Sequence, residues 1–444
     1  MKVALFVHCF FPEHFYGTET YTFEIARNLQ AMGHEPVVVS ATFQGEPTRE
    51  APLTRYEYKS VPVYLIDKNC FPTRRTRDTY YQPDMRDALK RILLEIAPDL
   101  VHVTHLGNHT AVLLDVNEEL GIPAVTTLTD FFGFCFKKTL EAADGSLCRG
   151  PSSTRVNCLA CTIKQSSQKR ADQLLYRWLA RPPWPVLGAA ALRLVHPGRL
   201  AEIVADVVAR PEILAQRYMK YRAAIAPTRF LAAAYVANGL TVPLHYMRFG
   251  VDMRAVPKVP KAANSPLRFG FIGQLAAHKG PDILIDAFRR LPKGVAELHI
   301  FGSTNEQGKH IEVLMQRAQG NAVRFRNTFP SERMPEVFAE LDCLVIPSRW
   351  YENSPLVLLN ALASHTPVIV SDVDGMTEFV TQGENGFVFR RGSVDELEKV
   401  MQALVKDPTA LRAMANTTNY PRSTRQMTED VVALYESVLK TSTA

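Results

Sequence analysis

Residues 342–372 read DCLVIPSRWYENSPLVLLNALASHTPVIVSD, and this stretch decides the fold. It opens on an apolar strand, passes through a polar loop into an apolar helical stretch, and closes on a second apolar strand. Ser354 and Pro355 are typical of a helix start, because serine caps well and proline suits the first helical position. A buried strand, a helix and another buried strand form the βαβ unit of a parallel sheet.

The same alternation runs outward in both directions. It continues in the C-terminal half from LRFGFIG at 267–273 to GFVF at 386–389. It also fills the N-terminal half, from KVALFVHCF at 2–10 to PLHYMRFG at 243–250. We therefore expect an α/β protein with two Rossmann-like, doubly wound parallel-sheet domains that face each other across a ligand-binding cleft.

Composition places the domain boundaries. Residues 1–252 form the predicted N-terminal domain, with a cysteine-containing insert and a basic helical segment at 133–222. Residues 253–266, MRAVPKVPKAANSP, are rich in proline and lysine without periodicity and are typical of a linker. Residues 267–424 form the second predicted domain, and 425–444 a helix that we expect to pack back on the first domain.

The overall composition is that of a soluble globular protein. Hydrophobic residues make up 46% and charged residues 22% of 444, and no stretch approaches the roughly 18 apolar residues of a spanning helix. We expect a cytoplasmic protein. The net charge of +6 is local, because 164–222 carries eleven Lys and Arg against four Asp and Glu, leaving −1 elsewhere. This pattern indicates an anionic partner at one surface and gives no reason to expect nucleic-acid binding.

The basic segment at 164–222 allows two interpretations. It contains YRWLARPPWPVLGAAALRLV at 176–195, which combines aromatic, basic and apolar residues. Such a composition is typical of a surface that lies on an anionic membrane or grips a lipid-linked acceptor. That interpretation places the protein peripherally at the inner membrane face. The alternative is a packed helical subdomain with solvated arginines.

Four of the seven cysteines gather in the predicted insert: Cys135, Cys148, Cys158 and Cys161. The last two form a CxxC pair, and four thiolates in one loop could hold a structural zinc ion. The other spacings are not those of common zinc fingers, so free thiols in a crowded loop are the alternative.

Several motifs, in order, resemble one family. They are YGTETYTFEIARNLQAMGHEPVVV at 16–39, GFIGQLAAHKG at 270–280, the 347–372 segment, GMTEFV at 375–380 and GENGFVF at 383–389. Together they resemble the retaining GT-B glycosyltransferases of the large family 4, or group 1, type. The resemblance covers nearly the whole chain and is strongest between 267 and 390.

In this family a glutamate, seven residues and a second glutamate follow one another. The resemblance implies that Glu352 faces the hydroxyls of the donor sugar. It also implies that a helix N-terminus receives the distal phosphate of a nucleoside diphosphate, at Ser354, Leu356 and Val357. The second glutamate, which holds the ribose, is Asn360 here. An amide keeps a hydrogen bond but loses the charge, which would cost about 1 kcal/mol of donor binding.

The resemblance makes Lys279 the lysine that neutralises the phosphates of the leaving nucleotide. Such a cation stabilises charge that grows in the transition state, so no metal is expected for catalysis. Gly273 and Gln274 belong to the same loop, and the family usually has an arginine where Gln274 stands. Arg349 is one residue that could replace the missing charge. Glu378 is expected at a second helix start on the nucleotide side.

The first βα turn, at 17–19, is the expected counterpart of the family's glycine-rich loop. Gly17 would let the backbone approach the donor phosphates, with Thr18 beside it. The family usually has two glycines in this turn. A tight turn without any ligand is the alternative interpretation.

Asp130 is expected at the end of a strand, where residues of the cleft belong. The family often has a histidine before this aspartate, and Thr129 stands there instead, so no catalytic histidine is predicted. His102, His105 and His109 cluster around a neighbouring strand end. They could line the acceptor side, although ordinary structural partners are more common for such histidines.

The resemblance implies a glycosyltransferase that moves a sugar with retention from a UDP- or GDP-linked donor to a glycan or lipid-linked saccharide. It also implies that 1–252 is the acceptor-side domain and 267–424 the nucleotide-sugar domain. Lys279, Glu352 and Asp130 are the predicted catalytic residues. The departures at Gln274 and Asn360 support a second hypothesis, a sugar-nucleotide-binding protein with little catalysis. A sugar-nucleotide epimerase on the same fold is the third, and no constellation of carboxylates and histidine in the sequence favours it.

Overall fold

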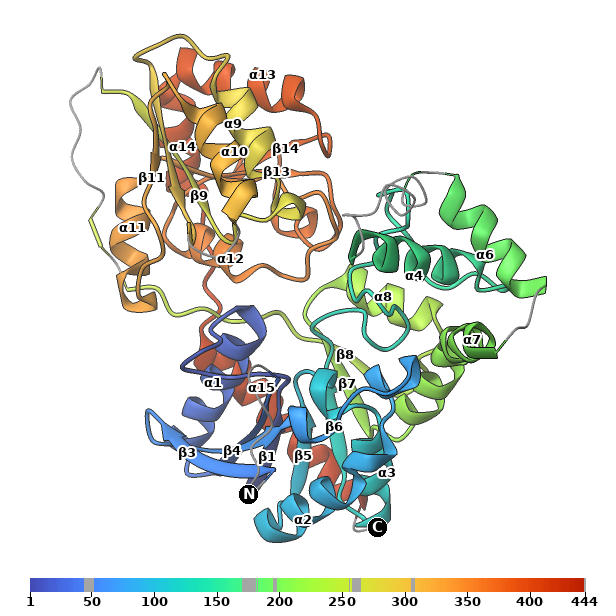
Figure 1. Cartoon of the computed structure of the whole chain (residues 1–444). Coiled ribbons are helices and arrows are strands. Elements are labelled where there is room, and N and C mark those ends of the chain that lie inside the picture. Colours follow the sequence, from blue (N-terminus) through green and yellow to red (C-terminus); the bar gives the residue numbers. More distant parts are fainter. Residues whose placement is uncertain are drawn as a thin grey trace. The chain divides into compact units, whose positions relative to one another are not determined.

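The computed structural model describes residues 1–43, 52–169, 181, 183–194, 198–254, 256–257, 265–304 and 308–442. The chain divides into two compact units (Figure 1). Unit 1 consists of Met1–Arg248 and Arg425–Ala444, and unit 2 of Phe249–Thr424. Most of the predicted linker at 253–266 lies outside the described residues, as does residue range 170–180 of the basic segment.

Unit 1 is built on an eight-stranded sheet in the order β3-β4-β2-β1-β5-β6-β7-β8. The strands are β1 Lys2–Phe6, β2 Glu35–Thr42, β3 Leu53–Tyr58, β4 Val61–Asp67, β5 Leu100–Val103, β6 Ala124–Thr127, β7 Ala223–Ala226 and β8 Leu244–Tyr246. All neighbours are parallel except β3 and β4, which are antiparallel. The sequence did not predict β3, because LTRYEY lies at the sheet edge and has no continuous apolar run.

The helices of unit 1 are α1 Gly17–Ala31, α2 Arg86–Ile96, α3 Val112–Glu119, α4 Val156–Lys169, α6 Trp184–Leu194, α7 Gly198–Tyr218, α8 Arg229–Ala237 and α15 Thr424–Ser442. Two predicted bounds were wrong. Strand β1 ends at Phe6, four residues before the predicted end, and the insert at 133–168 becomes helical at Val156. Among the described residues, no helix is long and apolar enough to cross a membrane.

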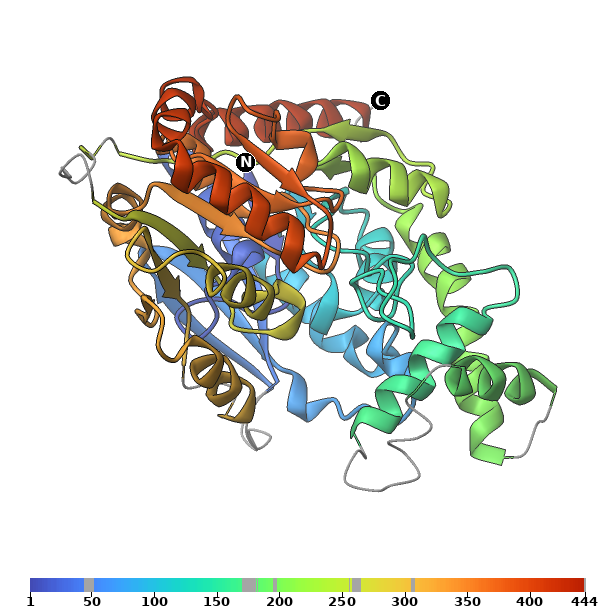
Figure 2. The ribbon, with the colours of Figure 1, turned by 90° about the horizontal axis from the view of Figure 1, so that it is seen from above.

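Helices α4, α6 and α7 pack together around a small apolar core. Leu159 and Ala160 of α4, Ala189 of α6, and Val204 and Val207 of α7 are all buried in it. Figures 1 and 2 show α4 and α6 lying side by side, and they contact each other extensively. The described part of the basic segment is therefore a packed helical subdomain. A membrane contact through this segment stays a prediction.

Unit 2 contains a fully parallel six-stranded sheet in the order β11-β10-β9-β12-β13-β14. The strands are β9 Leu267–Ile272, β10 Ala296–Phe301, β11 Val323–Phe325, β12 Cys343–Ile346, β13 Val368–Ser371 and β14 Gly386–Phe389. The helices are α9 Pro281–Phe288, α10 Gly308–Ala318, α11 Met334–Glu340, α12 Leu356–Ala363, α13 Val394–Lys406 and α14 Pro408–Thr417. The predicted α/β class with two doubly wound sheets is confirmed, with β3 as the one antiparallel strand among those described.

The two chain segments that lead into and out of unit 2 are hydrogen-bonded to each other. The Val251 N–H donates to the Arg422 carbonyl at 3.0 Å, and the Thr424 N–H donates to Oδ1 of Asp252 at 3.0 Å. Helix α15 follows directly and belongs to unit 1. Its Tyr435 hydroxyl lies 2.5 Å from Nδ1 of His102 on β5, and both side chains are fully buried.

The burial of His102 makes stability depend on pH. Desolvation lowers the pKa of His102 to about 3, whereas the unfolded chain has about 6.5. Between these values the unfolded state binds more protons, so stability falls as pH falls below about 6.5, by at most about 1.4 kcal/mol per pH unit for this histidine. We expect His102→Gln to reduce the loss of melting temperature between pH 7 and pH 5, measured by scanning fluorimetry. Parallel curves for the variant and the unmodified protein would contradict this assignment.

Candidate functional site

The predicted site in unit 2 centres on the carboxylate of Glu352, which is only 7% exposed. Its Oε1 accepts hydrogen bonds from Lys279 Nζ at 2.7 Å, Ser348 Oγ at 2.7 Å and Trp350 Nε1 at 3.2 Å. Within the described part of the chain, its Oε2 accepts none. A buried carboxylate needs such donors. Three of them hold one oxygen and leave the other available to a ligand.

Lys279 lies at the end of the loop that follows β9. Besides its ion pair with Glu352, its ammonium lies 5.5 Å from the centre of the Trp350 ring. The next residue, Gly280, has φ +70°, and a Cβ there would lie 2.1 Å from the Pro347 carbonyl oxygen. Only glycine allows this close approach. The backbone thus brings the Lys279 loop against the segment that follows β12.

Helix α12 starts one residue later than the sequence indicates. Pro355 is its N-cap, and Ser354 has φ +53° and makes no capping hydrogen bond, so its predicted capping role was wrong. The Leu358 N–H donates to the Pro355 carbonyl at 2.9 Å, which leaves Leu356 and Val357 at the open N-terminus. The Ser354 hydroxyl is buried and has no hydrogen-bond partner in the described residues.

A second loop packs against Glu352 from the side of β13. The Glu352 N–H donates to the Asp374 carbonyl at 3.2 Å. Gly375 follows with φ +86°, and a Cβ there would lie 1.6 Å from the Glu352 carbonyl oxygen. Glu378 stands three residues further on, half-buried in a short 3-10 turn. The structure therefore brings the Glu378 loop to the same site.

The other predicted nucleotide-side residues are less constrained. Gly273 directly follows β9 and its N–H donates to the Phe301 carbonyl at 3.0 Å, and Gln274 comes next, half-buried. Asn360 is half-buried in the second turn of α12. Arg349 is held by both oxygens of Asp282, at 2.8 and 2.7 Å. Arg349 therefore forms an ion pair of its own and does not stand in for the charge that Gln274 lacks.

In unit 1 the structure corrects the predicted turn at 17–19. Helix α1 begins at Gly17, so Thr18 is already helical and its carbonyl accepts from the Thr22 hydroxyl at 2.8 Å. A Cβ added at Gly17 would meet no described atom within 4 Å, and the φ of Gly17 is not positive. The backbone therefore does not require glycine at this position, and the loop after β1 extends from residue 7 to 16.

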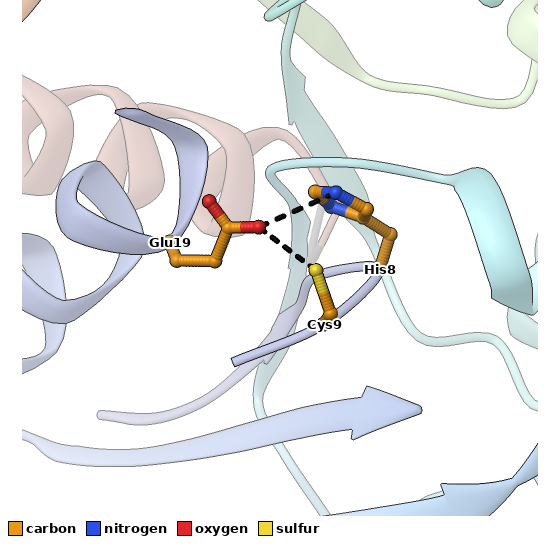
Figure 3. A group of neighbouring side chains, drawn as sticks. All are labelled: His8, Cys9 and Glu19. Carbon is orange, nitrogen blue, oxygen red and sulfur yellow. Dashed lines mark hydrogen bonds and ion pairs between the residues drawn. The ribbon is translucent and has the colours of Figure 1, made fainter. Parts of the chain in front are cut away.

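The sequence did not single out a cluster at this loop that Figure 3 shows: His8, Cys9 and Glu19. Glu19 Oε1 accepts from the Cys9 thiol at 2.8 Å and lies 3.3 Å from His8 Nε2. His8 Nδ1 and Glu19 Oε2 are buried and have no partner in the described residues. The sequence pattern assigns His8 and Cys9 to the preceding strand, so they were not recognised as part of a polar cluster.

These three side chains place one potential metal ligand each within 4.8 Å of the others, which no other such group among the described residues does. Burial, and then the charge of Glu19, raise the pKa of the Cys9 thiol well above its usual range. The thiol is therefore held as a protonated donor. The contacts of Cys9 and His8 with the same oxygen of Glu19 hold the cluster together.

Asp130 lies in the loop after β6, three residues beyond the strand. Its Oδ2 is 2.8 Å from His105 Nε2, and its Oδ1 accepts from the Phe132 N–H at 2.8 Å. Burial alone would raise the pKa of Asp130, but His105, Lys138 and the Phe132 N–H hold it below its usual range. The Gly107 N–H donates to His105 Nδ1 at 3.0 Å, so Nε2 carries the proton that His105 donates to Asp130.

Of the three clustered histidines, His102 and His109 have structural partners, and only His105 contacts Asp130. His102 is bonded to Tyr435 and to the Thr127 hydroxyl at 2.8 Å, and His109 Nε2 contacts the Val7 carbonyl at 2.7 Å. Both are fully buried structural residues. His105 alone among the three contacts a predicted site residue, and its spacing from Asp130 along the sequence gave no signal of the pair.

The four insert cysteines line one small pocket, together with Phe134 and Asn157. All four are free thiols. Burial raises the pKa of Cys158 to about 12 and that of Cys161 to about 11. No three of the four sulfur atoms lie within 4.8 Å of one another, whereas a tetrahedral zinc site needs sulfurs about 3.8 Å apart. Four cysteine thiols are suitable ligands for zinc. In this structure their sulfur atoms lie further apart than they would around a bound ion.

Comparisons with known proteins agree with both halves of the chain. The family "Glycosyl transferases group 1" matches residues 252–420, and "Glycosyltransferase Family 4" matches 15–141. D-inositol 3-phosphate glycosyltransferase from Nocardia farcinica is 26% identical over 261 residues, which cover 53% of this chain and 57% of that protein. The chain thus spans a little over half the length of this curated relative.

Two solved structures show the fold. HepE of Anabaena in complex with UDP is 16% identical with a TM-score of 0.66, covering 98% of this chain and 100% of that chain. Sucrose-phosphate synthase from Thermosynechococcus elongatus is 15% identical with a TM-score of 0.61, covering 99% of both chains. The two parallel-sheet units have the GT-B fold. The chain belongs to the glycosyltransferases of the group 1, family 4 type, as its motifs predicted.

A pair of glycine variants tests how the Glu352 loop is held. Gly375 and Gly383 both have positive φ, +86° and +78°, but only at Gly375 would a Cβ strike backbone, whereas nothing lies within 4 Å at Gly383. We expect Gly383→Ala to cost about 1 kcal/mol of backbone strain, and Gly375→Ala to cost roughly 1–3 kcal/mol more because Glu352 must shift. Urea unfolding of both variants measures the difference. Equal losses would show that the loops do not depend on this contact.

Proposed function

We propose that the protein transfers a sugar, with retention, from a nucleoside-diphosphate sugar to a glycan or lipid-linked saccharide. The observation that carries this proposal is the ion pair between Lys279 and Glu352. Lys279 lies in the loop after β9, and Glu352 lies in the loop that leads to the open N-terminus of α12. A cation, a buried carboxylate and a helix N-terminus are the three parts needed to hold a sugar attached to a diphosphate.

Each part has a role in the reaction. The bond between the anomeric carbon and the phosphate oxygen breaks, and Lys279 stabilises the negative charge that collects on the leaving diphosphate. The acceptor hydroxyl bonds to the anomeric carbon on the same face and gives its proton to the departing phosphate. Glu352 Oε2 accepts from the donor-sugar hydroxyls, while the Leu356 and Val357 N–H groups and the Ser354 hydroxyl donate to the distal phosphate. Asn360 contacts the ribose.

The comparisons support the nature of the donor. HepE, which has the same fold, binds UDP. This favours UDP over GDP as the nucleotide, with Lys279 and the helix N-terminus supplying the positive charge for transfer. Asp130, fixed by His105, acts on the acceptor side. A protein that works on such acceptors would remain cytoplasmic or peripheral at the inner membrane face.

One observation favours the alternative, a sugar-nucleotide-binding protein with little catalysis. Arg349 is paired with Asp282, so it does not supply the second positive charge that Gln274 lacks. Turnover of any donor that disappears in Lys279→Ala would reject this alternative. Donor binding without turnover, in the presence of saccharide acceptors, would favour it.

A thermal-shift panel of UDP, GDP, ADP, CDP and TDP tests the donor site. At about 100 times its dissociation constant, a bound nucleotide stabilises by about 2.7 kcal/mol. We expect UDP to stand out, and Lys279→Ala to weaken its binding about tenfold or more, since a charge-assisted bond to phosphate is lost.

The control is Lys293→Ala, which removes the same charge from an exposed position of unit 2. It should leave the UDP shift unchanged. If no nucleotide shifts the transition, or if both lysine variants bind UDP as the unmodified protein does, the proposed donor site is wrong.

The insert cysteines are the second part of the proposal. Cys135, Cys148, Cys158 and Cys161 hold one structural zinc ion, which draws their sulfurs together and keeps the loop around 135–150 in place. The support is that four thiols from two chain segments line a single pocket. A bound ion would displace the thiol protons despite their raised pKa values.

Elemental analysis of the purified protein should find about one zinc per chain. Cys148→Ser should reduce the zinc content and the melting temperature, because a ligand is lost. Cys70→Ser, which changes a half-buried cysteine outside the pocket, serves as the control and should retain the metal. Substoichiometric zinc together with an unchanged melting temperature after chelation would show that the thiols are free.

A further inference from the structure

A pocket of about 300 Å³ lies within unit 1, next to the cysteine pocket, with which it shares Phe136. The residues that line it come from the β4–α2 connection, the turn after β5, the insert and α7. Those that the argument uses are Lys68, Asp78, Gly107, Phe132, Lys138 and Arg210. The lining is rich in cations, and Asp78 is its only carboxylate among the described residues.

Arg210 on α7 is the most telling of these residues, because its side chain is 4% exposed. Its Nη2 donates to the Phe132 carbonyl at 2.7 Å, and the guanidinium lies 5.0 Å from the Phe132 ring and 5.4 Å from the Tyr80 ring. Its Nη1 is buried with no partner in the described residues. Leaving a charged donor unsatisfied is costly. An orphaned guanidinium nitrogen at a pocket points to an anionic ligand.

The other two cations also lack a counter-ion. In the described part of the chain, no carboxylate lies within ion-pair distance of Lys68, Lys138 or Arg210. Lys68 donates instead to the side-chain oxygen of Gln82, and burial lowers its pKa to about 8. Lys138 lies over the face of Phe132, at 5.4 Å. None of the three cations forms a direct ion pair within the described residues, although Lys68 also lies 3.5 Å from the Phe71 carbonyl and the Met85 sulfur.

Asp78 compensates only part of this positive charge. Its Oδ2 accepts from the backbone N–H groups of Arg74 and Arg75, at 2.9 and 3.1 Å, and so caps a short helical turn. Three cations and one carboxylate leave an excess of two positive charges on the lining. A phosphate monoester carries up to two negative charges and several acceptor oxygens, which matches this excess better than a single carboxylate does.

The pocket adjoins the acceptor-side pair. Gly107 lines it, and the Gly107 N–H fixes His105, which donates to Asp130. Lys138 lines it too, and its charge contributes to lowering the pKa of Asp130. A group anchored in the pocket would carry the attached sugar beside Asp130.

We propose that this pocket binds a phosphate monoester on the acceptor, so that the acceptor is a phosphorylated sugar or polyol. The inference rests on the proposed transferase function and specifies its acceptor. Arg210 and Lys138 bind the phosphate directly, and Lys68 adds charge from the side of β4.

Calorimetric titration at constant ionic strength tests the site with inorganic phosphate, inositol 3-phosphate and inositol as probes. We expect both phosphates to bind and inositol not to bind. Lys138→Gln should weaken phosphate binding about tenfold or more, as should Arg210→Met if it folds. Lys90→Gln, which removes an exposed lysine that pairs with Glu119, is the matched control and should bind as the unmodified protein does.

The outcomes separate this inference from the proposed function. If UDP binds but neither phosphate does, or if Lys90→Gln weakens binding as much as Lys138→Gln, the phosphate site is overturned while the donor site stands. If the phosphates bind with the expected variant pattern but no nucleotide binds, the pocket is confirmed and the transferase proposal fails.

Discussion

The burial of one carboxylate, that of Glu352, organises the loops of unit 2. Glu352 is almost fully buried, and Lys279, Ser348 and Trp350 offset the cost of burying its carboxylate by donating to the same oxygen. Those donors must come from two different loops, so the loop after β9 has to approach the loop after β12. Gly280 and Gly375 make these approaches sterically feasible on either side. The other carboxylate oxygen, Oε2, accepts no hydrogen bond within the described residues and could therefore accept one from a ligand.

Much of the fold could be predicted from the sequence, because buried parallel strands are rich in apolar residues. The helices between them repeat apolar residues every three to four positions. Strands β12, β13 and β14 of unit 2 appear as continuous apolar runs, whereas β9, β10 and β11 each contain a charged residue and were predicted from the alternation around them. Strand β3 could not be found this way, since an edge strand with one exposed face has no such run. Helix α4 was missed because its residues 156–169 begin inside a cysteine-rich stretch that has the composition of a loop.

The candidate site divides in the same manner. Lys279, Glu352 and the start of α12 belong to recognisable motifs, so their positions could be predicted. The His105–Asp130 pair and the cation pocket are formed by segments separated by many residues, so only the fold brings them together. The capping role of Ser354 was wrong because a left-handed backbone conformation, which composition does not report, moves the helix start to Leu356.

Unit 2 is an insertion into unit 1, because unit 1 contains the residues before 249 and after 424. The hydrogen bonds between 251–252 and 422–424 join the two ends of this insertion. During synthesis on the ribosome, the whole of unit 2 emerges before α15 does. Until α15 has been made, His102 lacks its hydrogen-bond partner Tyr435, and the surface that Tyr435 covers is exposed. The first unit can be completed only after residues 249–424 have been made, because α15 supplies the Tyr435 that covers His102.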